Sequence, residues 1–276
     1  MTTTTGGAAA VYAWLERWHQ TEWPELDVFL ASVTDHWATA AVVGPYARKV
    51  VEQVCGGIDF SQESFKFMDW RNGTAAGVPA RVFRISFSGE LSFEINVAAH
   101  HGRHLWETLM QAGADYGITP YGTEAMHVLR AEKGYIIAGQ DTDGSRTPGD
   151  MNMEWVVGWK KAFSFIGRRS LQREDCRRDD RKQFVGLETL EPETVIPEGA
   201  QIVSDPNQEV PMDMEGHVTS SYYSATLKRS IALAMVRRGL DRMGDIVYCP
   251  LADGRVIAAR ITGSVFYDPK GERQNA

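Results

Sequence analysis

The chain has 276 residues, of which 43% are apolar and 24% are charged, as in an ordinary folded globular protein. Its length exceeds one average domain and predicts two. Its 29 basic and 36 acidic side chains give a formal net charge of −7, so the chain as a whole lacks the basic surface that attracts nucleic acids and anionic lipids. We therefore expect neither nucleic acid nor a membrane among its partners.

The sequence also bears on the cellular compartment. Its aliphatic runs, such as residues 231–236, are far shorter than the ~20 residues that cross a bilayer. Residues 1–7 lack the basic and apolar regions of a secretory signal. Cys55, Cys176 and Cys249 are scattered and form no C-x-x-C motif, so no disulfide framework is expected. Together these features predict a cytoplasmic protein.

The start of the chain alternates extended and helical patterns. The threonine run is β-branched and favours a strand, and proline is tolerated in the first turn of a helix. Apolar residues at helical spacing follow the Gly6-Gly7 break. The predicted order is a strand at 2–5, a helix at 8–20, extended segments at 26–33 and 37–43, and a helix opened by Gly44-Pro45.

A β-hairpin is predicted over residues 81–97, because apolar and polar side chains alternate on both sides of Ser88-Gly89-Glu90. The polar face of its second arm carries Glu94. Helices are expected next at 101–116 and 122–133, the second ended by Gly134 at the C′ position. Strands and helices segregated in this way predict an α+β fold.

The composition changes between residues 159 and 182, where nine Lys or Arg stand against four Asp or Glu. We interpret this stretch as a linker with a short helix at 167–174. Short extended runs follow, which predict a small antiparallel β-barrel; they lie at 184–188, 200–203, 217–223, 230–236, 245–249 and 255–262. The predicted domains are 1–175 and 183–276.

Several familiar motifs are missing or incomplete. No G-x-G-x-x-G, Walker A or H-E-x-x-H motif occurs, so self-contained dinucleotide, ATP and zincin sites are unsupported. Residues 141–144 resemble the start of a calcium loop, but Arg146 and Asn152 stand where that loop requires Gly and Glu, which favours a turn. The histidines at 100–104 have no carboxylate or cysteine nearby, so no metal site is expected.

Two carboxylates, Glu94 and Glu132, each have either a structural or a ligand-binding role. Glu94 either faces water or binds a ligand, since a carboxylate on a rigid strand can accept hydrogen bonds from two adjacent N–H donors, as on a 2-aminopyrimidinone. Glu132 follows an apolar helical stripe and lies in the last turn, where the helix dipole disfavours negative charge. It needs a compensating donor, which is either a structural partner, such as an arginine of the 159–182 segment, or a ligand.

Three further features each allow two interpretations, one structural and one functional. Trp155 and Trp159 are one helical turn apart if that stretch is helical, which favours packing in the core over stacking on a ligand. The basic residues between 160 and 169 are either solvated or attract an anionic ligand tail. Residues 2–7 either fray or offer hydroxyl and N–H groups ahead of a helix.

Six segments carry a family resemblance: TTTTGGAA at 2–9, RISFSGELSFEI at 84–95, LRAEKG at 129–134, GQDTDG at 139–144, GHVTSS at 216–221 and VFYDP at 265–269. Over nearly its whole length, the chain resembles the C-terminal portion of the α subunits of heterotetrameric sarcosine oxidases. It is similar, more weakly, to glycine-cleavage T-proteins (aminomethyltransferases) and to the C-terminal region of dimethylglycine dehydrogenases.

This resemblance implies a ferredoxin-like folate-binding domain followed by a β-barrel. It implies a module that binds tetrahydrofolate and accepts the one-carbon unit released from sarcosine, forming 5,10-methylenetetrahydrofolate. The pterin-holding glutamate of the family falls on Glu94. Further cofactor contacts are expected at Thr2, Thr3, Thr4, Glu132 and Tyr267. No residue is an evident catalytic nucleophile or base.

Two departures from the family shape the expectation. Met126 stands where the T-proteins carry an arginine, which disfavours an independent aminomethyltransferase. The resemblance also implies more folate domain ahead of the threonine run, so the domain is expected to be N-terminally truncated here. Flavin and NAD are then expected only in missing or partner portions. The expected partners are the other sarcosine oxidase subunits or the missing N-terminal part. The alternative is a non-catalytic folate-binding or oxidase-assembly module.

Overall fold

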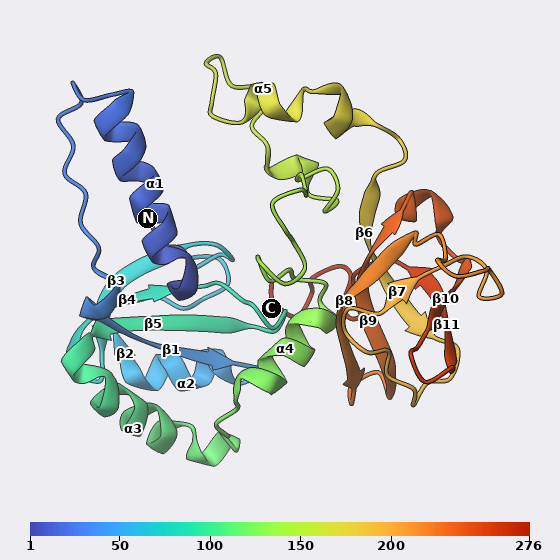
Figure 1. The fold of residues 1–276 in the computed structure, drawn as a ribbon. Helices are drawn as coiled ribbons and strands as arrows, with labels where there is room; N and C mark the ends of the chain where they lie inside the picture. The colour runs from blue at the N-terminus through green and yellow to red at the C-terminus, as the bar shows by residue number, and fades with distance from the viewer. The chain divides into compact units, whose positions relative to one another are not determined.

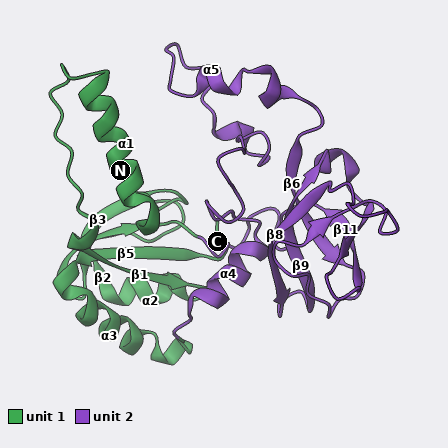
Figure 2. Cartoon of the chain, viewed as in Figure 1, with its two compact units in different colours: residues 1–86, 90–119, 274–276 green, residues 87–89, 120–273 purple.

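The computed structural model describes residues 1–276 and divides into two compact units (Figure 1). Figure 2 shows unit 1, residues 1–86, 90–119 and 274–276, and unit 2, residues 87–89 and 120–273. Each unit has one antiparallel sheet and its own apolar core, so the predicted α+β class is confirmed. None of the helices has the length and apolar character needed to cross a bilayer.

Unit 1 is built on a five-stranded antiparallel sheet with the strand order β1-β5-β4-β3-β2. Its strands are β1 (Trp37–Val43), β2 (Cys55–Gly56), β3 (Trp70–Ala75), β4 (Val78–Phe83) and β5 (Ser92–Ala98). Its helices are α1 (Ala8–Thr21), α2 (Ala47–Val54) and α3 (Gly102–Ala112).

The core of unit 1 lies between one face of this sheet and helices α2 and α3. Strand β5 sends Phe93 and Ile95 into that core, where both are fully buried. The ring of Phe93 meets the ring of Phe60 edge to face, with centroids 5.3 Å apart. Because side chains alternate along a strand, the residues between them, including Glu94, lie on the opposite face.

A tight turn joins β3 to β4. Ala76 and Gly77 have φ values of 50° and 77°. Positive φ at both central residues is the geometry of a type I′ turn, whose twist matches that of the flanking strands. This turn sets the register that places Trp70 opposite Phe83.

Unit 2 carries a six-stranded antiparallel sheet with the order β10-β11-β6-β9-β8-β7. Its strands are β6 (Lys182–Thr189), β7 (Gln201–Ile202), β8 (Gly216–Ser224), β9 (Arg229–Arg237), β10 (Ile246–Pro250) and β11 (Val256–Thr262). Its helices are α4 (Thr123–Glu132) and the short α5 (Arg168–Leu171).

Strand β9 is buried on both faces. Residues 230–236 are all buried, and this apolar run is typical of a strand covered on both sides. Ala232 and Ala234 contribute to one apolar cluster, whereas Leu233 and Met235 contribute to another that includes Ala131 of α4. Helix α4 therefore packs on the second face of this sheet. The main boundary between the two units lies between residues 119 and 120. The domain limits derived from composition, 1–175 and 183–276, stay a prediction.

The predicted barrel is realised as an open sheet. The paired strands do not close, and the link between the β7 and β10 sides is a single bridge in which Val203 and Tyr248 exchange two backbone hydrogen bonds of 2.9 Å. All six predicted strand segments are present.

Three predictions for the first half of the chain are wrong. Residues 2–5 form no strand, because the N–H of Gly7 bonds to the carbonyl of Thr4 and winds a 3-10 turn instead. Residues 26–33 pair with no strand. The first arm of the predicted hairpin ends at Phe83, where β4 stops pairing with β5. The helix ended by Gly134 is confirmed, and a Cβ on this glycine would meet the carbonyl of Ser264.

We predict that Phe93→Ala lowers the free energy of unfolding of unit 1 by about 3–5 kcal/mol, because it leaves a cavity in a close-packed aromatic cluster. Urea denaturation measures this change. The control is Phe29→Ala, which truncates a side chain that is 95% exposed and should change stability by less than about 0.5 kcal/mol.

Candidate functional site

Glu94 lies on β5, an interior strand of the unit 1 sheet, directly opposite Ala41 of β1 and Phe83 of β4. Its side chain is half-buried. Burial raises the pKa of this carboxyl, because the charged form loses hydration. A rigid central strand thus holds a partly dehydrated carboxylate, a group that binds N–H donors more strongly than one in open water.

Aromatic rings border Glu94 on the same face of the sheet. Residues directly opposite one another in antiparallel strands share a face, so Phe83 and Trp70 continue the row that begins at Glu94. Their rings are stacked, with centroids 6.2 Å apart. The guanidinium of Arg81 lies 5.1 Å from the ring of Trp37 and 5.4 Å from that of Trp70. This row offers flat apolar surface beside a carboxylate.

A polar pair lies two residues further along β5, on the same face of the sheet as Glu94. Thr39 Oγ1 donates a hydrogen bond of 2.6 Å to Asn96 Oδ1, and the two residues are opposite each other in the β1–β5 ladder. Neither Thr39 nor the aromatic row was predicted as part of the site. The signal that locates them is strand register, which depends on pairing between distant segments.

The predicted threonine contacts lie elsewhere in unit 1. Thr2, Thr3 and Thr4 are exposed and precede the 3-10 helix Thr5–Gly7 and α1. The hydroxyl of Thr3 donates to the carbonyl of Thr4 at 3.4 Å, which is a local contact. No hydrogen bond joins these residues to Glu94, so their role in binding stays a prediction.

Glu132 and Tyr267 are brought together in unit 2. The backbone N–H of Tyr267 donates to the carbonyl of Glu132 at 2.9 Å. The buried carboxylate of Glu132 accepts a hydrogen bond of 2.6 Å from the hydroxyl of Ser224 on β8. Glu132 therefore has a structural donor, as one of the two alternatives expected, but that donor is a serine and not an arginine of the 159–182 segment. Whether Glu132 or Tyr267 also contacts a ligand stays a prediction.

The same helix carries a fully buried ion pair. Arg130 Nη1 lies 2.5 Å from Asp141 Oδ2, and its Nη2 donates to Ser220 Oγ at 2.6 Å. The other oxygen of Asp141 accepts from Thr219 and Ser220 at 2.6 and 2.7 Å. Asp141 also accepts from the N–H of Ile137, and through these bonds it fastens α4 to β8. The turn predicted at 141–144 is confirmed, since the N–H of Ser145 donates to Asp143 Oδ1 at 2.8 Å.

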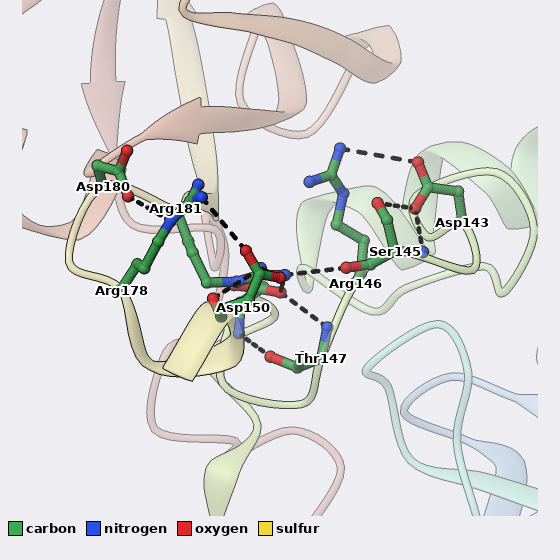
Figure 3. Close-up of polar contacts among 9 residues, drawn as sticks. Asp143, Ser145, Arg146, Thr147, Asp150, Arg178, Asp180 and Arg181 are labelled. Atoms are coloured by element: carbon green, nitrogen blue, oxygen red, sulfur yellow. Dashed lines mark hydrogen bonds and ion pairs between the residues drawn. The ribbon is translucent and has the colours of Figure 1, made fainter. Parts of the chain in front are cut away.

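Figure 3 shows a second polar network of unit 2, centred on Asp150 and Arg181. The guanidinium of Arg181 donates to both oxygens of Asp150, at 2.7 and 2.6 Å. Burial alone would raise the pKa of Asp150, but the hydrogen bonds from Arg181 and Thr147 lower it overall. The hydrogen bonds to Asp150 raise the pKa of Arg181 above its usual value. Arg181, one of the basic residues of the 159–182 segment, therefore has a structural role as the partner of Asp150.

A cavity of about 370 Å³ lies beside this network, lined in part by Glu154, Trp159, Cys176 and Arg177. Trp159 Nε1 donates to Glu154 at 2.6 Å. Trp155 is 80% exposed, so the prediction that it packs in the core is wrong. The stretch forms only a 3-10 helix, Glu154–Val156, and helical spacing does not apply beyond it.

Comparison with known proteins identifies the family and the fold of this chain. Residues 1–161 match the GCVT N-terminal domain, and residues 182–268 match the glycine cleavage T-protein C-terminal barrel domain. The chain belongs to the glycine cleavage T-protein family. The solved aminomethyltransferase T of the glycine cleavage system from Bartonella henselae has the same fold, with a TM-score of 0.79 at 22% identity over 96% of this chain and 67% of that chain.

Particular relatives are closer in sequence. Sarcosine oxidase subunit alpha from Corynebacterium sp. (strain P-1) is 49% identical over 100% of this chain and 28% of that protein. The corresponding subunit from Rhizobium meliloti is 40% identical over 99% of this chain and 28% of that protein. The predicted resemblance is confirmed. The chain spans about 28% of the length of these subunits.

We predict that Asp141→Ala destabilises unit 2 by about 3–5 kcal/mol, because it leaves the charge of Arg130 buried without its partner. Urea denaturation gives the change in free energy of unfolding. Asp253→Ala is the matched control, since it removes an exposed aspartate that also pairs with an arginine, and its unfolding curve should overlay that of the parent chain. Equal effects of the two substitutions would contradict the assignment.

We predict that Glu94→Gln raises the thermal midpoint near neutral pH. The pKa of Glu94 is raised by burial, so its ionisation destabilises the folded state above the folded pKa and has no such effect below the pKa of an unfolded glutamate, about 4.3. The gain should therefore shrink as the pH is lowered through the folded pKa. Thermal melts of both chains across this range measure it, and a pH-independent difference would refute the explanation.

Proposed function

We propose that the chain is the folate-binding segment of a sarcosine oxidase α-type subunit, with a ferredoxin-like folate domain and a barrel domain. It positions tetrahydrofolate to accept the methyl carbon of sarcosine as 5,10-methylenetetrahydrofolate. The observation that carries this proposal is the half-buried carboxylate of Glu94 on a central strand, in a chain 49% identical to sarcosine oxidase subunit alpha.

The residues around Glu94 fit a reduced pterin. Its amino-pyrimidine edge presents adjacent N–H donors, which two carboxylate oxygens can accept together. The rings of Phe83 and Trp70 supply flat surface on the same face of the sheet. When bound, tetrahydrofolate supplies the nitrogens that take up the one-carbon unit.

The contribution of this chain is positioning. Holding the acceptor in place replaces a dilute encounter with a high effective concentration. Oxidation of sarcosine belongs, in this proposal, to flavin and NAD sites in other portions or subunits of a cytoplasmic oxidase. Thr2, Thr3, Thr4, Glu132 and Tyr267 are proposed as further contacts to the cofactor.

We predict that Glu94→Gln weakens tetrahydrofolate binding by about tenfold or more, since a neutral amide cannot replace a charged acceptor of two hydrogen bonds. Isothermal titration calorimetry of the purified chain measures the dissociation constant. Glu107→Gln is the matched control, because Glu107 is an exposed glutamate of unit 1 paired with Arg103, and affinity should not change.

The same titration separates the alternatives. Binding that is equal in the parent chain and in Glu94→Gln would refute the role of Glu94. Absence of binding to the parent chain would refute the folate proposal and leave an assembly role in the oxidase. In a separate activity assay, transfer of an aminomethyl carbon by the isolated chain would support a free aminomethyltransferase, which Met126 disfavours.

A further inference from the structure

A cluster of positive charge lies at one end of the unit 2 sheet. Lys182 of β6 is directly opposite Arg237 of β9, so the two side chains share one face of the sheet. His217 of β8 is opposite Met235, which in turn is opposite Phe184, and this row lies on the same face two residues along the strands. Strand register therefore places two cations and an imidazole in adjacent rows of one face.

A third cation comes from the segment that joins α4 to β6. Arg146 belongs to this segment, and its Nη2 lies 3.7 Å from Asp143 Oδ2 (Figure 3). The backbone carbonyl of Ser145 accepts a hydrogen bond of 2.9 Å from Arg181, the residue before Lys182. This bond holds the segment, and Arg146 with it, beside the start of β6.

The positive charge of this cluster exceeds what the nearby carboxylates balance. Burial, together with the charges of Arg146 and Arg237, lowers the pKa of Lys182. Burial, together with the charges of Lys182 and Arg146, lowers the pKa of His217. The carboxylate of Asp143 acts in the opposite direction on both groups without cancelling either effect. The local charge is therefore positive.

Two of the donors in this cluster have no acceptor in the protein. Lys182 and His217 are half-buried, and their side-chain nitrogens make no hydrogen bond or ion pair. The neighbouring carboxylates are already engaged, Asp143 with N–H and hydroxyl donors of its own turn and Asp213 with Arg237 at 3.4 Å. Half-buried donors without an acceptor are unfavourable, and a bound ligand that accepts from them removes this cost.

We propose that Arg146, Lys182 and His217 form a binding site for a phosphate-type dianion on unit 2. Their donors come from three separate segments and can approach one bound group from different directions. A tetrahedral oxyanion offers acceptor oxygens in all of these directions, whereas the two oxygens of a carboxylate lie in one plane. The bound anion neutralises the excess positive charge. The site is independent of the folate proposal, because it uses none of the residues proposed to contact that cofactor.

Nuclear magnetic resonance of the histidine rings tests the site. Sodium sulfate is the probe, because sulfate stays doubly charged throughout a histidine titration, and His217→Gln assigns the His217 signal by removing it. We expect sulfate to raise the pKa of His217, since a bound anion favours the protonated ring, and to bind more tightly as the pH falls through that pKa. The exposed His36 is the internal control.

Lys182→Gln removes one charged donor and keeps the position polar. The pKa of His217 should rise in this variant even without sulfate, because the charge of Lys182 lowers it in the parent chain. Sulfate affinity should fall at least about tenfold. Lys270→Gln is the matched control at an exposed lysine of unit 2, and its sulfate affinity should equal that of the parent chain. Circular dichroism of each variant confirms that it is folded.

Three results would overturn the proposal. If sodium chloride at equal ionic strength raises the pKa of His217 as much as sulfate does, the effect is charge screening and no site exists. If the parent chain and Lys182→Gln bind sulfate equally well, the assigned donors are wrong. If malonate, a dicarboxylate of the same charge, binds as tightly as sulfate, the site does not select a tetrahedral oxyanion.

Discussion

The alternation of side chains along β5 is the constraint on which the rest of unit 1 depends. Phe93, Ile95 and Val97 enter the core beneath α2 and α3, where all three are fully buried and their apolar side chains stabilise the fold by leaving water. The residue between the first two is then forced to the other face. The position of Glu94 follows from packing, and a shift of register by one residue would place it in the core.

This arrangement has an energetic consequence for the carboxylate. The strands on either side keep Glu94 partly out of water. Partial burial of a charged carboxylate does not stabilise the folded state, because the group loses hydration. Residues that reduce the stability of a fold in this way are often found where a ligand supplies the missing interaction. In unit 2 the buried charges are arranged differently, because Asp141 and Asp150 each meet an arginine and several hydroxyl or N–H donors.

The elements that could be predicted from the sequence are those set by local pattern. The apolar run of β9, the alternation along β5 and the glycine that ends α4 each act over a few residues, and all three appear where expected. The threonine run misled because β-branched residues form a strand only where a partner strand is available. The serine partner of Glu132 lies 92 positions away, and no local pattern indicates it.

Both sheets end in a very short strand on one side, which limits how copies of the chain can associate. Strands β2 and β7 have two residues each, too few to template the addition of a foreign strand. The bridge between Val203 and Tyr248 occupies part of β10. The seven-residue β1 is left as the longest sheet edge, so unwanted polymerisation at high protein concentration is expected to start there.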